Sequence, residues 1–468
     1  MPDSIVKPVP HQLVLALSWL FAILYGVWIL PETVFIRHFC LVAGAVLSLY
    51  VIYPNRTLLL QKKALPIWLI VGLIVWVTLH LFVFSHDFER QLNEYTKIWK
   101  KIAISIVFAI GLGFALISQI QDTTKTKTYW KIIYFGFMLP TLVYFIKYLT
   151  TKYAPQFDYV VPKFLVLSPD ALNNPLGIAR AFYVFYCLPA FAMSIGMIAY
   201  LIREKIFSIK TGLVYLITPP LTLLIFYIEG DRFGIIFSVL IILFSFGEIF
   251  FPLIKKKVLN LQSGLILLLT LTVSVFIIAK SVQSNAQWKT VLVDAKLAVQ
   301  VEKYDAWKYN RETHPGYPIN EMGIPASDSN YMRIAWAIVG VNLLQENPMG
   351  YGLLSLSFGE LSREKWPDAE TSWSHSAWLD FALGYGMPGV ALLGAAAAFA
   401  LIYGIFLPYP WSLLGFWALM ITSLVLATKE LSTEVIINCY IFLIVWVSAL
   451  SVGYGERQKS VNKKSSIY

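Results

Sequence analysis

Long apolar segments follow one another along most of the chain and are separated by short polar breaks. A helix needs about 20 mostly apolar residues to cross the roughly 30 Å hydrocarbon core of a bilayer, and this length rule predicts about twelve membrane-spanning helices. They fall at 12–30, 35–53, 66–84, 101–120, 130–149, 178–202, 211–228, 233–253, 262–280, 378–404, 411–428 and 434–453. The predicted fold is an all-α integral membrane protein.

The composition agrees with this pattern. Of the 468 residues, 58% are hydrophobic and 14% are charged, which is too apolar for one soluble globule. The first apolar segment lacks a small-residue cleavage pattern before Pro31, so we expect it to stay as the first helix. The three cysteines, Cys40, Cys187 and Cys439, lie in separate predicted spans, and they predict neither a disulfide nor a metal site.

Lysine and arginine gather in alternate short loops, and such loops resist transfer across the membrane. One set of segments holds Arg56, Lys62 and Lys63, then Lys125, Lys127 and Lys131, then Arg203, Lys205 and Lys210, then Lys255, Lys256 and Lys257, and finally Arg457, Lys459, Lys463 and Lys464. We predict that this side is cytoplasmic and carries both termini, with the basic loop 85–101 as an exception on the other side. The net charge of +10 then indicates topology and attraction to anionic membrane lipids, and it predicts no nucleic-acid partner.

The pattern changes once, between residues 281 and 377. This change predicts four parts: nine helices in 1–280, a large and mostly helical loop outside the cytoplasm in 281–377, three helices in 378–453, and a basic cytoplasmic tail in 454–468. Within the loop, an amphipathic helix with Trp288, Val291, Leu292, Ala295 and Val299 on its apolar face is expected on the membrane or the bundle. The apolar segment Ile334–Gln345 predicts a short buried or re-entrant helix, which ends at a turn over Asn347–Gly352.

Four polar residues stand where polarity is costly, while the common soluble-enzyme motifs, such as a P-loop, GxSxG or HExxH, are absent from the sequence. Arg232 lies in a very short hairpin between two apolar segments, and Arg180 lies at the outer end of the sixth span. Arg333 opens the short loop helix, and His375 directly precedes the tenth span. Each has a structural interpretation, as a snorkelling or Asp231-paired arginine, a surface arginine or an interfacial histidine. The functional interpretation is an anion site at the mouth of a membrane cavity.

Taken together, these residues match a family pattern. The segment Arg333-Ile334-Ala335-Trp336, then Glu346-Asn347-Pro348-Met349-Gly350-Tyr351-Gly352, His375-Ser376-Ala377-Trp378-Leu379 and Gly384-Tyr385-Gly386-Met387-Pro388-Gly389 resembles the O-antigen ligase and polymerase superfamily of bacterial membrane glycosyltransferases. The layout is similar too, with about twelve spans, a large periplasmic loop before the last few, and an arginine before a middle span. The chain departs from the family at Asp231-Arg232-Phe233, where many members have Ser-Arg-Gly, and at Ser376, where asparagine often follows the histidine.

The resemblance implies a GT-C-like enzyme of the bacterial inner membrane with its active site on the periplasmic face. It implies metal-independent transfer of a glycan from undecaprenyl diphosphate to a sugar hydroxyl of lipid A–core, with inversion at the anomeric carbon and no cofactor. Arg232 and Arg333, with Arg180 third, would hold the diphosphate and stabilise its growing charge. His375 would act as the base, since a histidine with an ordinary pKa near 6.5 is mostly neutral at pH 7. Trp336, Trp366, Trp373 and Trp378 would stack on sugars or form an interfacial belt.

Other functions stay open at this point. An O-antigen polymerase uses the same donor with a second lipid-linked glycan as acceptor, although the dominance of one outer loop over the modest 151–177 loop favours the ligase. A protein-glycosylating ligase is a further relative. A transporter of lipid-linked glycans belongs to a different class and predicts a site at the membrane midplane, whereas the ligase predicts that Arg232, Arg333 and His375 converge on one outward cavity.

Overall fold

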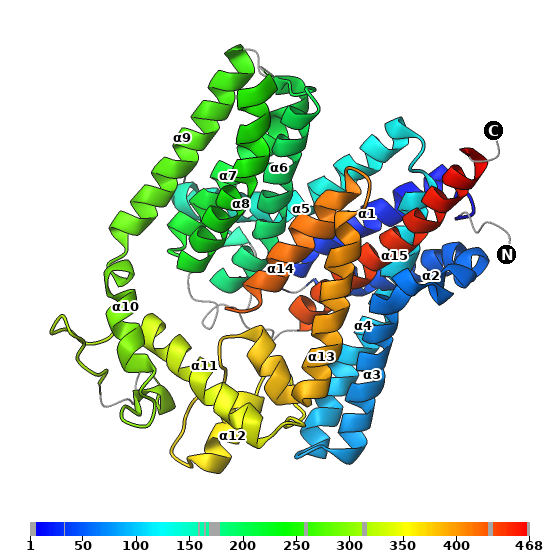
Figure 1. Ribbon diagram of the computed structural model, residues 1–468. Helices are drawn as coiled ribbons and strands as arrows, with labels where there is room; N and C mark the ends of the chain where they lie inside the picture. The colour runs from blue at the N-terminus through cyan, green and yellow to red at the C-terminus, as the bar shows by residue number, and fades with distance from the viewer. Residues whose placement is uncertain are drawn as a thin grey trace.

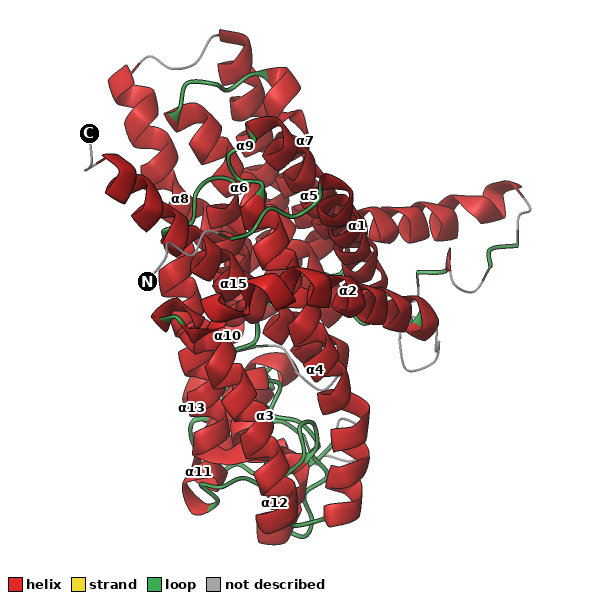
Figure 2. Cartoon of the chain, turned by 90° about the vertical axis from the view of Figure 1, so that its right-hand side faces the viewer, coloured by secondary structure: helices red, strands yellow, loops and turns green. Residues whose placement is uncertain are grey.

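The described part of the chain is helical. The computed structural model describes residues 6–31, 33–157, 160–162, 165–167, 178–256, 261–310, 316–428 and 434–465. Figure 2 shows helices joined by loops throughout these residues, and the one β-type contact found in them is an isolated bridge between Ile319 and Pro325. The predicted all-α class is therefore confirmed.

The helices follow the predicted spans closely. They are α1 His11–Trp28, α2 Val34–Asn55, α3 Leu65–Val83, α4 Phe88–Ser118, α5 Thr123–Tyr153, α6 Arg180–Arg203, α7 Ile209–Ile228, α8 Arg232–Lys256, α9 Leu261–Ser284, α13 Ala377–Ile405, α14 Leu419–Val425 and α15 Glu434–Ser465. The predicted span 411–428 is divided between a π-helical segment, Leu413–Ala418, and α14. Among the described residues, ten helices are long and apolar enough to cross a membrane. Two shorter apolar stretches, Arg232–Ser245 and Leu413–Val425, lie at the eighth and eleventh predicted spans.

The prediction of a loop at 85–101 is wrong for most of this segment, because α4 already begins at Phe88. The Asp87 carboxylate accepts a hydrogen bond from the Arg90 N–H at 3.0 Å and so caps the helix. The length rule located only the apolar part of this helix, since its first turns are rich in charged residues. These turns extend α4 toward the large loop, where Arg90 pairs with Glu360 at 2.9 Å.

The helices are arranged as two neighbouring groups with a layer across one end (Figure 1). Helices α6 to α9 stand together, and α1 to α4 lie beside α15, whose apolar stretch Val435–Tyr454 is entirely buried. The layer contains α10 Gln287–Ala298, α11 Asp328–Glu346 and α12 Ser357–Lys365, next to the ends of α3, α4 and α13. This layer has its own apolar core, which includes Trp307, Tyr331, Val339 and Phe358.

The two ends of α4 identify two sides of the molecule. Near its C-terminal end, Gln119 donates a hydrogen bond to the Val9 carbonyl at 2.7 Å, and Lys7 donates to Asn55 at 2.9 Å, so segments predicted to be cytoplasmic lie together. Near its N-terminal end, Glu94 accepts a hydrogen bond from the Leu354 N–H of the large loop at 2.7 Å. The predicted sorting of segments into two sides is thus consistent with the packing, while the assignment of these sides to compartments stays a prediction.

The amphipathic segment of the loop forms α10, but with a different buried face from the one expected. Thr290, Asp294 and Ala298 face inward, whereas Leu292 is 80% exposed. We expected the apolar residues to form the buried face of this helix. The buried face is instead partly polar, because Asp294 accepts hydrogen bonds from Asn320 and Asn330 inside the layer.

The turn over Asn347–Gly352 docks onto a break in α13. The Tyr351 N–H donates to the Leu383 carbonyl at 2.7 Å, the Gly352 N–H donates to Gly384 at 2.7 Å, and the Met387 N–H donates to Pro348 at 2.8 Å. Gly350 has φ +85° and Gly386 has φ +68°, and a Cβ on Gly350 would lie 2.5 Å from the Gly386 nitrogen. The glycines of both family-like motifs therefore allow two backbones to meet directly.

We expect Gly350→Ala to lower the free energy of unfolding by about 2 kcal/mol, because a side chain is disfavoured at this positive φ and would also meet backbone. The measurement is the unfolding temperature followed by tryptophan fluorescence at one scan rate. Gly394→Ala in α13 is the matched control, since nothing lies within 4 Å of its added Cβ, and a helical alanine should be neutral or stabilising. Equal unfolding temperatures for the two variants would show that the backbone docking is unimportant.

Candidate functional site

Arg232 connects a membrane helix to the large loop. It is the first residue of α8 and follows a tight turn in which Gly230 has φ +63°. The Asp231 carboxylate accepts a hydrogen bond from the Gly234 N–H at 2.9 Å and caps the helix. The half-buried guanidinium of Arg232 donates to Asn330 Oδ1 at 2.6 Å and to the hydroxyl of Ser329, both on α11. Its position is thus fixed by the loop, not only by its own helix.

A buried carboxylate lies behind this contact. Asn330 accepts from Arg232 through its oxygen and donates through its nitrogen to Asp294 at 2.9 Å. Asp294 is fully buried, and it also accepts from the Asn320 side chain at 2.9 Å and from the Ser327 N–H at 3.2 Å. Since an amide oriented at both ends cannot rotate freely, Asp294 positions Arg232 through Asn330.

Arg333 lies beside the same helix terminus. Its guanidinium stacks 4.7 Å from the ring centroid of Phe233 and donates to the Thr428 carbonyl at 3.1 Å. Phe233 is one of the departures from the family pattern, and here it provides an aromatic face for the second arginine. Arg232 lies close enough to Arg333 for the two positive charges to repel each other, and the Asp231 and Asp294 carboxylates offset part of that charge. The first turn of α8 adds the positive end of a helix dipole.

His375 lies further along the same face of α11. Its ring stacks on Trp336, with centroids 4.9 Å apart and an interplanar angle of 27°. Trp336 follows Arg333 by three residues and therefore lies on the same side of the helix. His375 itself has φ +57°, an uncommon conformation for a residue with a side chain. The turn is stabilised by Ser374, whose N–H donates to Asp380 at 3.0 Å.

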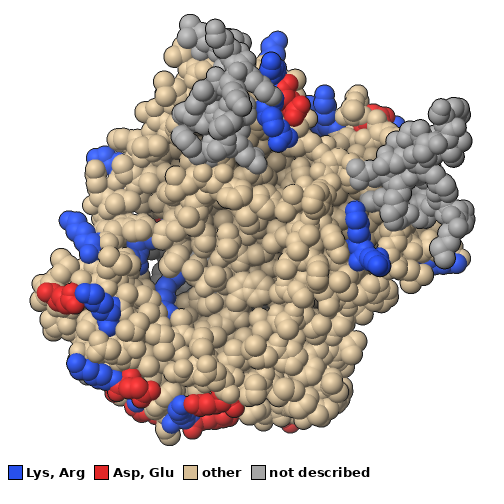
Figure 3. Space-filling model, viewed as in Figure 1, with Lys and Arg blue, Asp and Glu red and all other residues tan. Residues whose placement is uncertain are grey.

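Helix α11 therefore brings three of the four predicted site residues to one region. Arg232 contacts it through Ser329 and Asn330, Arg333 belongs to it, and His375 stacks on its Trp336. In the space-filling view a small hollow lies between the α10–α11 layer and the ends of the α6–α8 group, and lysine and arginine atoms line its edge (Figure 3). Arg180 is the first residue of α6, but its side chain lies outside the described part of the structure.

The four tryptophans take different positions. Trp336 donates its indole N–H to the Trp307 carbonyl at 2.9 Å, and Trp366 meets the Trp307 ring edge to face at 4.9 Å. Trp378 donates to the Ser423 carbonyl at 2.9 Å, while Trp373 is 41% exposed. Trp336 and Trp366 thus belong to the loop layer, whereas Trp378 contacts α14. The four tryptophans therefore do not form one continuous group.

Sequence reasoning did not identify Asn330 or Asp294, and it noted Phe233 only as a departure from the family pattern. A signal for Asp294 was available: it lies three residues after Val291 in the amphipathic segment, so a charged residue stands on the same side of the helix as an apolar one. Asn330 and Phe233 carry no motif, because their role depends on neighbours about a hundred residues away. Within the described residues, no three His, Cys, Asp or Glu side chains group together as a metal site would require.

No protein-family model and no curated protein sequence matches the chain.

We expect Asp294→Asn to lower the free energy of unfolding by about 2 kcal/mol, because the Asn330 amide and the Ser327 N–H lose an ionised acceptor in a buried place. The change is measured as the shift in unfolding temperature. Glu321→Gln is the control, since Glu321 is an exposed carboxylate paired with Lys296 at 2.9 Å and should contribute less than about 0.5 kcal/mol. Similar small shifts in both variants would contradict the proposed network.

The same carboxylate predicts a pH dependence. Burial raises the pKa of Asp294, but hydrogen bonds from Thr290, Asn320, Asn330 and the Ser327 N–H outweigh it and hold the pKa below the ordinary 3.8. Such a carboxylate stabilises the fold above its unfolded-state pKa, and this stability is lost as the pH falls through the lower folded-state pKa. The difference in unfolding temperature between wild type and Asp294→Asn should therefore stay constant from about pH 8 to 5. It should shrink below about pH 3.8, and a difference that grew there would contradict the assignment.

Proposed function

We propose that this protein is a membrane glycosyltransferase that moves a glycan from undecaprenyl diphosphate to a sugar hydroxyl of lipid A–core, on the periplasmic face of the bacterial inner membrane. The proposal rests on one observation above the others. Helix α11 gathers two arginines and a histidine at the end of a membrane helix, in the order that the family-like motif gives them. A lipid diphosphate has its charged group at the membrane surface and its chain in the bilayer, so a cationic site at the end of a membrane helix suits such a donor.

Each residue has a defined part in the proposed reaction. Arg232 and Arg333, with Arg180 as a third candidate, bind the diphosphate, because guanidinium groups present several donors in a plane and do not lose their charge. The acceptor hydroxyl oxygen attacks the anomeric carbon while the bond from that carbon to the diphosphate oxygen breaks. His375 takes the hydroxyl proton, and undecaprenyl diphosphate leaves with the bonding electron pair. The configuration at the anomeric carbon inverts in this single displacement.

The arginines supply the electrostatic contribution. Charge grows on the diphosphate as it leaves, and two preorganised cations stabilise that charge without having to reorient. The Asp294 and Asn330 network and the Phe233 ring support this role, because they hold the two guanidinium groups in place despite their mutual repulsion. A transporter with a midplane site would have no evident need for an arginine bound to an outer-loop helix.

We expect His375→Ala to reduce transfer by at least about 100-fold, because general base catalysis contributes on the order of 10² to 10⁴ in rate. The assay incubates purified protein with undecaprenyl-diphosphate glycan and lipid A–core in the presence of a chelator, and follows the ladder of products. His86→Ala is the matched control, since His86 lies on the surface 3.7 Å from Glu364 and outside the arginine cluster. Full activity in His375→Ala would remove the proposed base.

The same assay separates the alternatives. Arg333→Lys keeps the charge but loses the planar donors, so its rate of transfer should fall. Arg203→Lys is the control and should leave the rate unchanged, because Arg203 is the last residue of α6 and pairs with Glu204. Product on a second lipid-linked glycan and never on the core would identify a polymerase. Movement of intact donor across a vesicle membrane without any new glycosidic bond would identify a transporter.

A further inference from the structure

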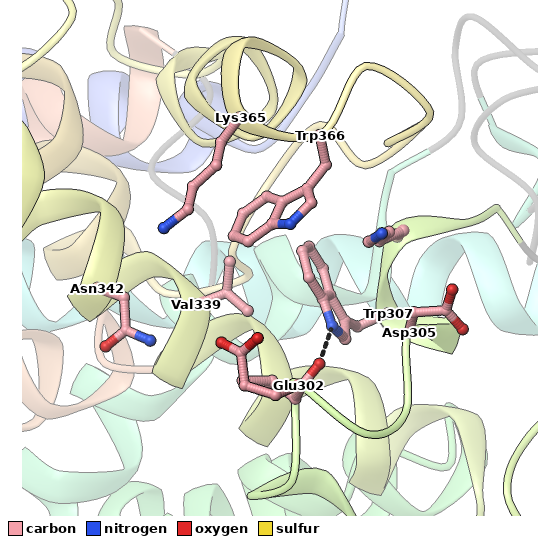
Figure 4. A pocket seen from close by; sticks show the side chains of 9 residues that line it. Glu302, Asp305, Trp307, Val339, Asn342, Lys365 and Trp366 are labelled. Atoms are coloured by element: carbon pink, nitrogen blue, oxygen red, sulfur yellow. Dashed lines mark hydrogen bonds between the residues drawn. The ribbon is translucent and has the colours of Figure 1, made fainter.

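The large loop contains a pocket that the proposed reaction does not use. It encloses about 80 Å³ and lies between the segment around Trp307, helix α11 and the end of α12 (Figure 4). One water molecule needs roughly 10–15 Å³ of such space, so the pocket has room for several polar atoms. That is enough for one edge of a monosaccharide.

Two tryptophans form the aromatic wall of this pocket. The rings of Trp307 and Trp366 meet at 80° with centroids 4.9 Å apart, and the indole N–H of Trp307 donates to the Val301 carbonyl at 3.2 Å. Trp307 is almost fully buried, whereas Trp366 is partly exposed. Trp307 therefore supports Trp366 from within, and the partly exposed Trp366, whose ring has the Lys365 amine 4.9 Å from its centroid, is the apolar surface on which the C–H face of a sugar ring can pack.

Hydrogen-bonding groups surround the same space. Glu302, Asn342 and Lys365 line the pocket, and Figure 4 shows the Lys365 amine and the Asn342 amide across Val339 from the two indoles, with the Glu302 carboxylate beside Val339. A carboxylate accepts from hydroxyl groups, an amide both donates and accepts, and an ammonium group donates. An apolar wall with a few convergent polar groups is typical of a small-molecule site.

The charge of the pocket limits its ligand. Both lysines of the lining are paired, Lys308 with Asp368 at 3.6 Å and Lys365 with Glu346 at 2.5 Å. Glu302 and Asp305 are the two carboxylates of the lining, so its acidic and basic side chains balance, and both of its lysines already have carboxylate partners. This balance disfavours a phosphorylated or acidic sugar and favours a neutral one.

The pocket also adjoins the proposed base. The carbonyl of Trp307 accepts the indole N–H of Trp336, and the ring of Trp336 stacks on His375. Trp336 therefore links the Trp307 side of the pocket to His375 through one hydrogen bond and one ring contact.

We propose that this pocket is a saccharide subsite that binds a neutral hexose unit. On the proposed function, that unit is a sugar neighbouring the one whose hydroxyl reacts. Trp366, supported by the buried Trp307, provides the packing surface, and Glu302 and Asn342 orient the hydroxyl groups.

The test measures sugar binding without any transfer. Full-length protein in phosphatidylcholine nanodiscs, which avoid the sugar headgroups of maltoside detergents, is titrated with methyl α-glucopyranoside and with glucose 6-phosphate while saturation transfer NMR is recorded. Glu302→Ala and Asn342→Ala should each raise the Kd for the neutral sugar by about tenfold. Glu321→Ala, an exposed carboxylate outside the pocket, should leave the Kd unchanged. Glucose 6-phosphate should bind at least about tenfold more weakly than the neutral sugar.

Two results would overturn the subsite: equal Kd values in wild type, Glu302→Ala and Asn342→Ala, or tighter binding of glucose 6-phosphate. Because this measurement needs neither lipid donor nor His375, it can succeed when the transfer assay fails. Conversely, transfer to lipid A–core that is undiminished in both pocket variants would refute the subsite and leave the proposed transferase intact.

Discussion

The contact between the backbone of the Asn347–Gly352 turn and the broken part of α13 is the constraint on which the outer layer depends. Three backbone hydrogen bonds join these two segments, and both have glycine where a side chain would separate them. Helix α11 ends directly before the turn, so its C-terminal end is fixed against a membrane helix. Its other end is held by Asn330 and Ser329 to Arg232. The helix that carries Arg333 and Trp336 is therefore tied to the bundle at both ends.

This arrangement explains how a loop residue and a membrane residue can share one site. The repulsion between Arg232 and Arg333 would separate two free side chains. Here each is held by neighbours of a different kind, an amide backed by a buried carboxylate for Arg232 and an aromatic ring for Arg333. Both guanidinium groups are consequently in place before any anion arrives, which is the condition for electrostatic stabilisation without reorganisation.

Apolar segment length located ten described helices that could cross a membrane, because burial in hydrocarbon depends on local composition, and the count of twelve stays a prediction. The length rule failed at α4, whose charged first turns are outside the apolar stretch, and the apolar spacing failed at α10, whose inner face includes Asp294. The candidate residues Arg232, Arg333 and His375 could be singled out as polar groups in costly places or as parts of a motif. Asn330, Phe233 and Trp307 could not, since their contacts join segments far apart in the chain, and no local pattern encodes them.

The docking of the turn onto α13 uses backbone atoms on both sides, whereas the pocket beside Trp307 is lined by side chains. Substitutions at Glu302 or Asn342 can therefore change which molecule fits without disturbing the joint that holds the layer to the membrane helices. A fold built in this way separates the residues that must stay constant for assembly from those free to diversify. Changes in the pocket should therefore alter binding alone, while changes at the glycines of the joint should alter the stability of the whole layer.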